Sequence, residues 1–232
     1  MHVQPLASSE EPLLSTPSRD EAAVPDLLGV LSYGALVAFD NLGADARLAP
    51  DLRRRAALSE MAAAELVHYR RLADRLTELG VDPVEAMTPF VESLDAYHES
   101  TRPSDWLEGL VKAYIGDGIA DDFYLEVAAG LAEPDRALVL EVLHDDRHAE
   151  FAVSEVRAAV DADPQRADRL GLWARRLVGE AVAQAQLVVA ARPALVTLVE
   201  PFVPDGPDGL TALIDRLTAS HANRLATLGL RS

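Results

Sequence analysis

The chain has 232 residues, of which 49% are hydrophobic and 25% charged, a composition typical of a soluble globular domain. Cysteine is absent, which excludes disulfides, thiolate metal sites and cysteine nucleophiles, so any metal ion would need oxygen and nitrogen ligands. The net charge of −17 disfavours general nucleic-acid binding, because phosphate contacts supply much of that affinity. We expect a cytoplasmic protein without a membrane span, since no signal peptide opens the chain and Asp, Arg or Pro interrupt its apolar stretches.

The N-terminal part is predicted to hold a tail and two long helices. Residues 1–25 are rich in Ser, Pro and Glu without a hydrophobic period, which is typical of a disordered tail. Over 26–47 apolar residues occur on nearly all sides, so we expect a core helix that packs against several neighbours. A second helix is expected over 50–79, because Pro50 fits a first helical turn and Gly80 follows the last apolar residue.

The rest of the chain predicts only further helices. They are expected over 83–99, 104–132, 134–162, 164–193 and 209–228. The first three of them have start signals at Asp82, Ser104 and Pro134. No segment shows the alternation of period two that a half-buried strand requires.

This order of helices predicts an all-α architecture. Two antiparallel helix pairs with tight turns, joined by a long crossover over 83–99, match a ferritin-like four-helix bundle. We therefore treat 26–232 as one domain. Its core bundle is expected over 26–162, with two additional C-terminal helices over 163–232 packed on it.

The second predicted helix places Glu65 and His68 one turn apart inside its apolar stripe. That stripe consists of Leu58, Met61, Leu72, Leu76 and Leu79. A residue in the stripe faces the core, where an unpaired carboxylate costs several kcal/mol unless a proton, a cation or a metal ion compensates it. Glu65 therefore needs a partner from another helix.

Two further helices carry inward polar residues that could supply this partner. The fourth predicted helix has Asp145 and His148 at the same three-residue spacing, inside its own apolar stripe. The third predicted helix has Asp117 and Asp121 in its stripe. Counted from the predicted turns, these residues and Glu65 lie at heights that agree within a turn or two. Carboxylates and imidazoles from three helices are thus expected to converge in the bundle interior.

Spacing by itself is weak support for a site, because 38 of 232 residues are acidic and the odds of an acid three positions before a given histidine are about one in six. Six histidines give about one such pair by chance, and four occur. We interpret Asp95/His98 and Glu141/His144 as surface contacts. Only the other two pairs lie in apolar stripes.

A cluster of carboxylates and imidazoles repels itself when empty. Iron or manganese with oxygen and nitrogen ligands would remove that repulsion, as in di-iron carboxylate bundles. The predicted metal ligands are Glu65, His68, Asp117, Asp121, Asp145 and His148. The alternative is a set of inward acids that pair with arginines such as Arg147 or stay protonated. No residue is assigned a catalytic role beyond metal binding.

These motifs resemble those of a known family, the tRNA 2-methylthio-isopentenyladenosine hydroxylases. Glu65-Leu66-Val67-His68-Tyr69 is similar to the Glu-x-x-His of their second helix, and Asp145-Asp146-Arg147-His148 to the Glu-Ala-Arg-His of their fourth. Asp121-Asp122-Phe123 falls where that family has Glu-Arg-Phe. The chain also resembles shorter actinobacterial ferritin-like proteins that are described as similar to this hydroxylase. That resemblance lies in the segments 33–47, 65–79, 83–90 and 116–126. The resemblance covers about 26–162.

The resemblance implies a dinuclear iron centre that activates O2 with two external electrons and hydroxylates the isopentenyl side chain of a modified adenosine in tRNA. It implies one third-helix carboxylate, Asp117 or Asp121. The other implied ligands, terminal or bridging, are Glu65, His68, Asp145 and His148. The implied partners are tRNA and an electron donor, and a homodimer is compatible with the sequence.

Two departures from the family pattern bear on the metal. The family has a first-helix carboxylate level with Glu65, but Ser32 and Tyr33 stand at that height here, and Asp40 is about 10 Å too low. Asp145 replaces a glutamate and has a reach shorter by one methylene. These changes leave open a mononuclear centre, or a metal-free scaffold that binds a partner or an apolar ligand. Iron storage is less favoured.

Two C-terminal side chains, Glu180 and His221, could replace the missing ligand, although a solvated or packing role is commoner for such residues. A basic face for tRNA could form on the second helix, for which the simpler interpretation is a solvated helix surface. Its members are Arg53, Arg54, Arg55, Arg70, Arg71 and Arg75. Lys112 is the only lysine in the chain.

Overall fold

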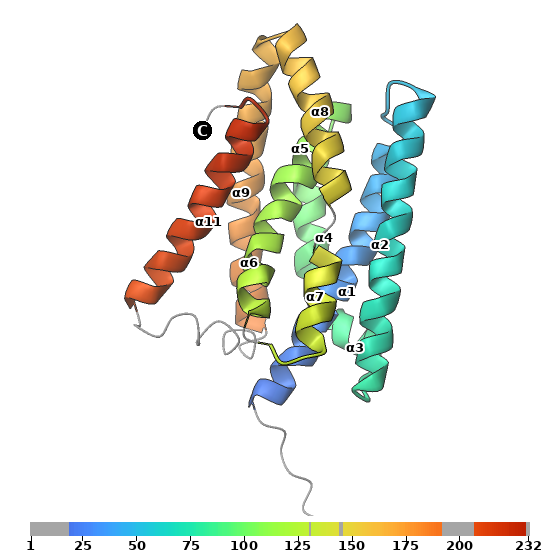
Figure 1. Cartoon of the computed structure of the whole chain (residues 1–232), viewed down its shortest axis with the longest axis vertical. Coiled ribbons are helices and arrows are strands. Elements are labelled where there is room, and N and C mark those ends of the chain that lie inside the picture. The colour runs from blue at the N-terminus through green and yellow to red at the C-terminus, as the bar shows by residue number, and fades with distance from the viewer. Residues whose placement is uncertain (1–18, 130, 144–145, 192–206, 231–232) are drawn as a thin grey trace, which may run out of the picture.

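The computed structural model describes residues 19–129, 131–143, 146–191 and 207–230, and every regular element among them is helical (Figure 1). In chain order the elements are α1 (Arg19–Asp45), α2 (Leu52–Glu78), α3 (Pro83–Met87), η1 (Thr88–Phe90), α4 (Val91–Ser100), α5 (Trp106–Val111), η2 (Lys112–Asp117), α6 (Gly118–Ala128), α7 (Asp135–Leu143), α8 (Asp146–Ala162), α9 (Gln165–Ala191) and α11 (Pro207–Thr227). The predicted all-α class is confirmed.

The first two long helices differ from the prediction at their starts. α1 begins at Arg19, earlier than predicted, and its buried core residues begin at Ala23. α2 begins after Asp51, whose carboxylate accepts a hydrogen bond from the Arg54 amide at 2.9 Å. Pro50 therefore precedes the cap instead of opening the helix. Residues 1–18 of the predicted tail lie outside the described residues.

The crossover expected as one helix over 83–99 is divided into three segments. α3 starts at Pro83 after the predicted cap Asp82, the 3-10 turn η1 follows, and α4 continues to Ser100. Pro89 lies in η1 and has no amide hydrogen for an α-helical hydrogen bond, which explains the break.

The third long helix also has three segments, and Asp105 caps it in place of the predicted Ser104. The Asp105 carboxylate accepts a hydrogen bond from the Glu108 amide at 3.0 Å. The Glu108 carboxylate in turn accepts hydrogen bonds from the amide and the hydroxyl of Ser104. The backbone amides of Ser104 and Glu108 therefore both have hydrogen-bond partners at the start of the helix. The middle segment η2 is a π-helix, and the helix ends at Ala128 rather than at residue 132.

The remaining helices follow the prediction with small shifts. α7 begins at Asp135, and residues 144–145, which separate it from α8, lie outside the described residues. α11 ends at Thr227, and Gly229 has a φ of +73°, the left-handed conformation that stops helices. The predicted stop of α9 at Pro193 lies outside the described residues.

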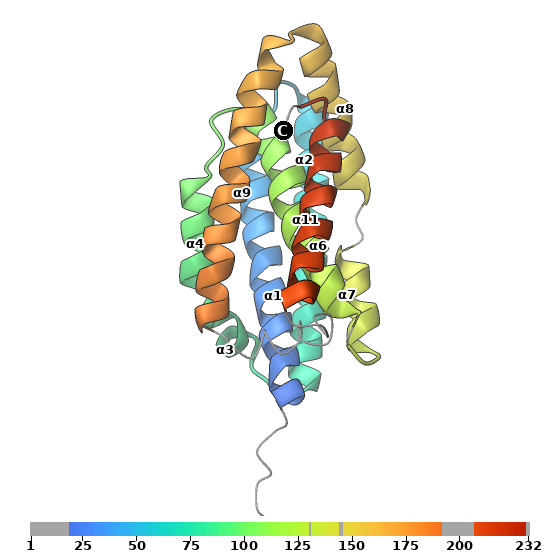
Figure 2. The ribbon, with the colours of Figure 1, turned by 90° about the vertical axis from the view of Figure 1, so that its left-hand side faces the viewer.

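The helices form a four-helix bundle with two helices added on one side. α1 and α2 are an antiparallel pair, and α5–η2–α6 and α7–α8 supply the third and fourth long helices (Figure 1). α9 contacts the crossover helix α4 and the third helix, as Figure 2 shows from the side, and α11 packs on α6. The two C-terminal helices therefore lie on the side away from α2.

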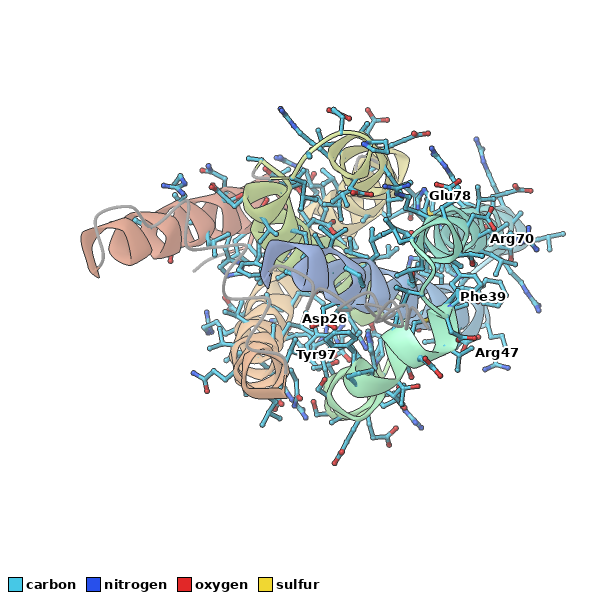
Figure 3. The ribbon with its side chains drawn as sticks, turned by 90° about the horizontal axis from the view of Figure 1, so that it is seen from below. Asp26, Phe39, Arg47, Arg70, Glu78 and Tyr97 are labelled. Carbon is cyan, nitrogen blue, oxygen red and sulfur yellow. The ribbon has the colours of Figure 1, made fainter. Side chains whose placement is uncertain are left out.

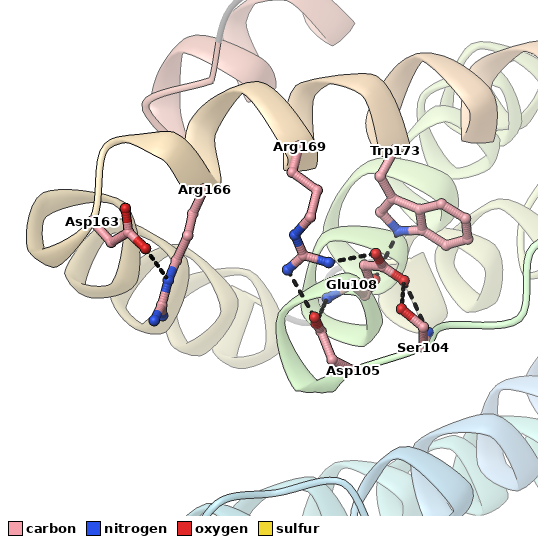
Figure 4. Close-up of polar contacts among 7 residues, drawn as sticks. All are labelled: Ser104, Asp105, Glu108, Asp163, Arg166, Arg169 and Trp173. Carbon is pink, nitrogen blue, oxygen red and sulfur yellow. Dashed lines mark hydrogen bonds and ion pairs between the residues drawn. The ribbon is translucent and has the colours of Figure 1, made fainter.

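Polar contacts fix α9 on the start of the third helix (Figure 4). The Arg169 guanidinium lies 2.7 Å from the Asp105 carboxylate and 2.6 Å from that of Glu108. The indole N–H of Trp173 donates to the Glu108 carbonyl at 3.0 Å. Because the Trp173 ring is also buried in the core, this set of contacts fixes the height of α9 along the bundle.

The apolar core consists of two clusters stacked along the bundle axis. The upper cluster lies nearer the α1–α2 turn, and its buried members are Leu42, Ala46, Leu58, Ala62, Trp106, Leu110, Val111, Ile115, Ala152, Val156, Leu170, Trp173, Ala174, Leu177, Leu225, Leu228 and Leu230. The lower cluster lies nearer the crossover, and its buried members are Ala23, Leu27, Leu28, Val30, Leu31, Leu72, Leu76, Ala86, Phe90, Val127, Ala128, Leu131 and Val139.

One described helix, Ala23–Asp45 within α1, is long and apolar enough to cross a membrane by length and composition. The expectation that every apolar stretch falls short of a span is therefore wrong for this segment. Core helices of soluble proteins meet the same test, and 39% of the apolar window is buried inside the bundle. Its role in both apolar clusters accounts for this composition.

Candidate metal centre

The predicted ligands of α2 lie in the interval between the two apolar clusters. Along this helix the upper cluster ends at Ala62 and the lower cluster begins at Leu72. Glu65 and His68 lie between them, with side chains that are 16% and 15% exposed. The apolar stripe of α2 is thus interrupted at mid-height by a carboxylate and an imidazole, as the sequence predicts.

By their position along the chain, the other predicted ligands fall between buried residues of the same two clusters. In the third helix the buried upper cluster ends at Ile115 and the lower begins at Val127, and positions 117 and 121 lie between. In the fourth helix the lower cluster includes Val139 and the upper includes Ala152, and positions 145 and 148 lie between. We call this interval the polar layer. Its predicted members are Glu65, His68, Asp117, Asp121, Asp145 and His148.

Within the polar layer the structure brings Glu65 and His68 together. The Nδ1 atom of His68 lies 3.4 Å from the Oε2 atom of Glu65. A hydrogen bond from Arg71 on α2 lowers the pKa of Glu141 on α7, and the charge of His68 lowers it further. The exposed Arg71–Glu141 ion pair therefore joins α2 to α7 beside the candidate ligands.

The described residues do not complete a metal site. Among them, no group of three His, Asp or Glu side chains is close enough to hold a metal ion. Asp121 is described and half-buried on α6, whereas the side chains of Asp117 and His148 and the whole of Asp145 lie outside the described residues. The proposed pairing of inward acids with Arg147 also falls there.

The first helix places neutral residues at the height of Glu65. Counted back from the α1–α2 turn, Ser32 and Tyr33 are level with it. Ser32 is fully buried, and its hydroxyl has no hydrogen-bond partner in the described part of the chain. The Tyr33 hydroxyl donates to Asp95 at 2.6 Å, and burial, together with this carboxylate, raises the pKa of Tyr33 to about 12.

Neither suggested replacement ligand is placed in the polar layer by an observed contact. Glu180 on α9 accepts a hydrogen bond from the Ser100 hydroxyl at the end of α4, which fits a packing role. His221 lies on α11, where burial and the charge of Arg224 lower its pKa. The surface pair predicted at Asp95 and His98 is divided, because Asp95 binds Tyr33 and His98 binds Asn41.

A clamp on the third helix was missed by the sequence interpretation. Arg224 of α11 binds both carboxylate oxygens of Asp122, at 2.5 and 2.6 Å, directly after the predicted ligand Asp121. The charge of Asp121 also contributes, after burial, to a raised pKa of Tyr124. No local pattern could have predicted the clamp, because its two residues are 102 positions apart.

The helices, their order and the polar layer can be compared with known proteins. A model of the ferritin-like domain of actinomycetes matches residues 18–201. The chain belongs to this ferritin-like family. A solved structure described as protein 19 with aldehyde deformylating oxidase activity from Synechococcus is similar to this ferritin-like protein, with a TM-score of 0.69 and 18% identity over 93% of both chains. That likeness shows the shared fold. No curated protein matches the chain.

The polar residues of this ferritin-like protein fit an iron ion in donor type. Carboxylate oxygens and imidazole nitrogens are the ligands that iron prefers in bundles of this kind. His68 turns Nδ1 toward Glu65, so the two predicted α2 ligands lie side by side. The fit is incomplete on α1, where Ser32 and Tyr33 stand at the height of Glu65 and neither offers a carboxylate.

Proposed function

We propose that this ferritin-like protein is a non-haem iron oxidoreductase with its centre in the polar layer. The proposal depends on the Glu65–His68 pair, which is partly buried between two apolar clusters and combines a carboxylate oxygen with an imidazole nitrogen, the donor types that iron prefers. When bound, iron would supply the activation of O2. Glu65 and His68 would hold it from α2, with Asp117 or Asp121 from the third helix and Asp145 and His148 from the fourth.

We further propose that the reaction is hydroxylation of the isopentenyl group of a modified adenosine in tRNA. In such a reaction one oxygen atom of O2 enters a C–H bond and the other leaves as water, with two electrons and two protons consumed. An external donor must supply the electrons. The support is the similarity of the motifs at Glu65 and Asp145 to those of the tRNA hydroxylases, and a cytoplasmic location suits this substrate.

Exposed arginines on the α1–α2 side support a contact with RNA phosphates. In the part of the chain that the structure describes, Arg47, Arg53, Arg55 and Arg70 form no ion pair, although the protein is strongly acidic overall. Figure 3 shows Arg47 and Arg70 extending outward on this side. Arginines without carboxylate partners keep their full charge for a phosphate backbone.

The deciding experiment for the metal is its stoichiometry. The protein is purified aerobically after loading with Fe2+, and iron is measured per chain. Two ions support a dinuclear centre and one supports a mononuclear centre. A Glu65→Ala/His68→Ala variant should lose most of the iron, whereas an Asp95→Ala variant, in which the altered acid binds Tyr33, should keep it. Iron near zero in the unaltered protein would refute the proposal.

The substrate requires a separate assay. Iron-loaded protein, a chemical reductant and O2 are incubated with tRNA that carries the isopentenyl modification, and nucleosides are analysed by mass spectrometry. A gain of one oxygen atom supports the tRNA proposal. A parallel reaction with a long-chain aldehyde tests the substrate class named for the Synechococcus protein. Product from the aldehyde alone would contradict the tRNA proposal while leaving the iron centre intact.

A metal-free scaffold is the second candidate, and the first helix favours it. Ser32 and Tyr33 stand at the height of Glu65, so α1 offers no anionic ligand there. The buried Ser32 hydroxyl could instead bind a polar atom of a ligand held in the bundle. A chain with no bound iron, and with stability unchanged by Fe2+, would favour this candidate.

A further inference from the structure

The only lysine of the chain is buried inside the bundle. Lys112 is 5% exposed and is the first residue of the π-helical segment η2. Every other basic residue is an arginine, so the chain uses lysine solely at this interior position. A lysine ammonium is compact, whereas the planar guanidinium of arginine needs more room. Position 112 therefore suits the small ammonium group of lysine better than the larger guanidinium group of arginine.

Residues of α1 and α4 lie near the Lys112 ammonium. Its Nζ atom lies 5.6 Å from the centre of the Tyr97 ring on α4. Burial raises the pKa of Asp45 on α1 to about 6, with the nearby charge of Lys112 opposing this shift. Burial, and then the charge of Lys112, lower the pKa of His98 to about 3. We call these four residues, Lys112, Asp45, Tyr97 and His98, the lysine cluster.

Two glycines make room for the lysine cluster on the third helix. A Cβ atom at Gly109 would lie 2.8 Å from Oδ2 of Asp45, and one at Gly116 would lie 2.5 Å from the Tyr97 hydroxyl. Both positions stand three or four residues from Lys112, on the same side of the helix. The helix surface is therefore shaped to receive a carboxylate and a phenol on either side of the ammonium.

The π-helix determines the direction of the residues that follow it. Such wide turns are rare, occur as single turns within α-helices and are frequent at functional sites. One additional residue in a turn rotates the rest of the helix by about 100° and shifts it by about 1.5 Å relative to a continuous α-helix. The direction in which Asp121 leaves the third helix therefore depends on η2 staying in place between residues 112 and 117.

We propose that Lys112, together with Tyr97 above Gly116, locks the π-helical turn in register and so orients Asp121 for metal binding. Lys112 is then a positioning residue that acts through Asp121. The lock fixes both ends of η2, because Lys112 begins the segment and Gly116 lies near its end. The functional part of this inference depends on the proposed iron centre.

The lock is tested first on the metal-free full-length protein by hydrogen exchange. Lys112→Met keeps the length of the side chain and removes its charge. Amide exchange in the peptide that covers residues 112–121 should accelerate at least tenfold, whereas peptides from α2 should change less than twofold. The matched control is Arg102→Met, which removes an exposed cation at the end of the neighbouring α4. Equal exchange over 112–121 in Lys112→Met and the unaltered protein would overturn the lock.

A second pair of variants tests the other end of η2. Gly116→Ala places a methyl group against the Tyr97 hydroxyl, so it should accelerate exchange over 112–121 and weaken Co2+ binding, followed by visible absorption, at least tenfold. Adding Tyr97→Phe removes the clashing oxygen and should restore both quantities to within threefold of the Tyr97→Phe single variant. Failure of this rescue would refute the role of the Tyr97–Gly116 contact.

The outcomes separate the lock from the iron proposal. If the unaltered protein binds no Co2+, the metal centre fails and the exchange experiment alone decides the lock. If the unaltered protein binds Co2+ and Lys112→Met accelerates exchange without weakening binding, the lock exists but does not position the ligands, which overturns the functional part. Accelerated exchange with weakened Co2+ binding supports the whole inference.

Discussion

Replacing Asp45 by asparagine should stabilise the protein above pH 7, although it removes a carboxylate close to the only lysine. Burial raises the pKa of Asp45 from 3.8 to about 6. Because the folded state binds this proton more tightly than the unfolded state, the stabilising contribution is complete below pH 3.8 and is lost as the pH rises through about 6. A shift of roughly two pKa units, at about 1.4 kcal/mol per unit, corresponds to about 3 kcal/mol.

The assay is urea unfolding of Asp45→Asn and the unaltered protein at pH 7.5 and pH 4.5. Asparagine has the shape of the protonated carboxyl group and carries no charge. The variant should be more stable by up to about 3 kcal/mol at pH 7.5 and by about 1 kcal/mol at pH 4.5. Asp40→Asn, an exposed acid on the same helix, is the control and should change little. A less stable Asp45→Asn at pH 7.5 would refute the reasoning, because attraction to Lys112 would then exceed the cost of burial.

Four further predictions follow from the same structure. His98, whose pKa burial lowers to about 3, contributes stability that is present above pH 6.5 and is lost as the pH falls, so His98→Gln should flatten the stability profile between pH 6.5 and 4 in urea titrations. Arg224→Ala should cost about 2 kcal/mol in chemical unfolding, because it leaves the partly buried Asp122 without its clamp, whereas Arg102→Ala should cost under about 0.5 kcal/mol. Glu65→Ala should raise the melting temperature of the metal-free protein and lower its iron content, and unchanged values of both would contradict a metal-binding role. Replacing Arg53, Arg55 and Arg70 together by alanine should reduce the slope of log K for tRNA against log salt by about two to three, and an unchanged slope would exclude this face.

The polar residues of α2 could be predicted from the sequence because helical periodicity is a local property. Glu65 and His68 interrupt the apolar stripe of α2, and the structure places them between two apolar clusters. Their side chains are in contact with each other. The heights counted from the turns also place Asp121 in the polar layer. Convergence of the ligands from the fourth helix stays a prediction, since Asp145 and the side chain of His148 lie outside the described residues.

Two errors at helix starts arose where two start signals compete. Pro50 and Asp51 both mark a helix start, and the hydrogen bond from the Arg54 amide selects the aspartate. Ser104 and Asp105 compete in the same way, and Glu108 accepts from one while its amide donates to the other. The residue types at both positions of each pair are compatible with a helix start. The geometry of the first turn therefore decides which residue is the cap.

The sequence by itself determined the all-α class, the number of long core helices and the interruption of their apolar stripes by acids and histidines. These features depend on period, caps and composition, which act over a few residues. Only the tertiary structure decided that Arg224 clamps Asp122, that Tyr33 binds Asp95, and that Lys112 lies near residues of α1 and α4. Such contacts join residues far apart in the chain, and their partners are selected by how whole helices pack, which no local pattern encodes.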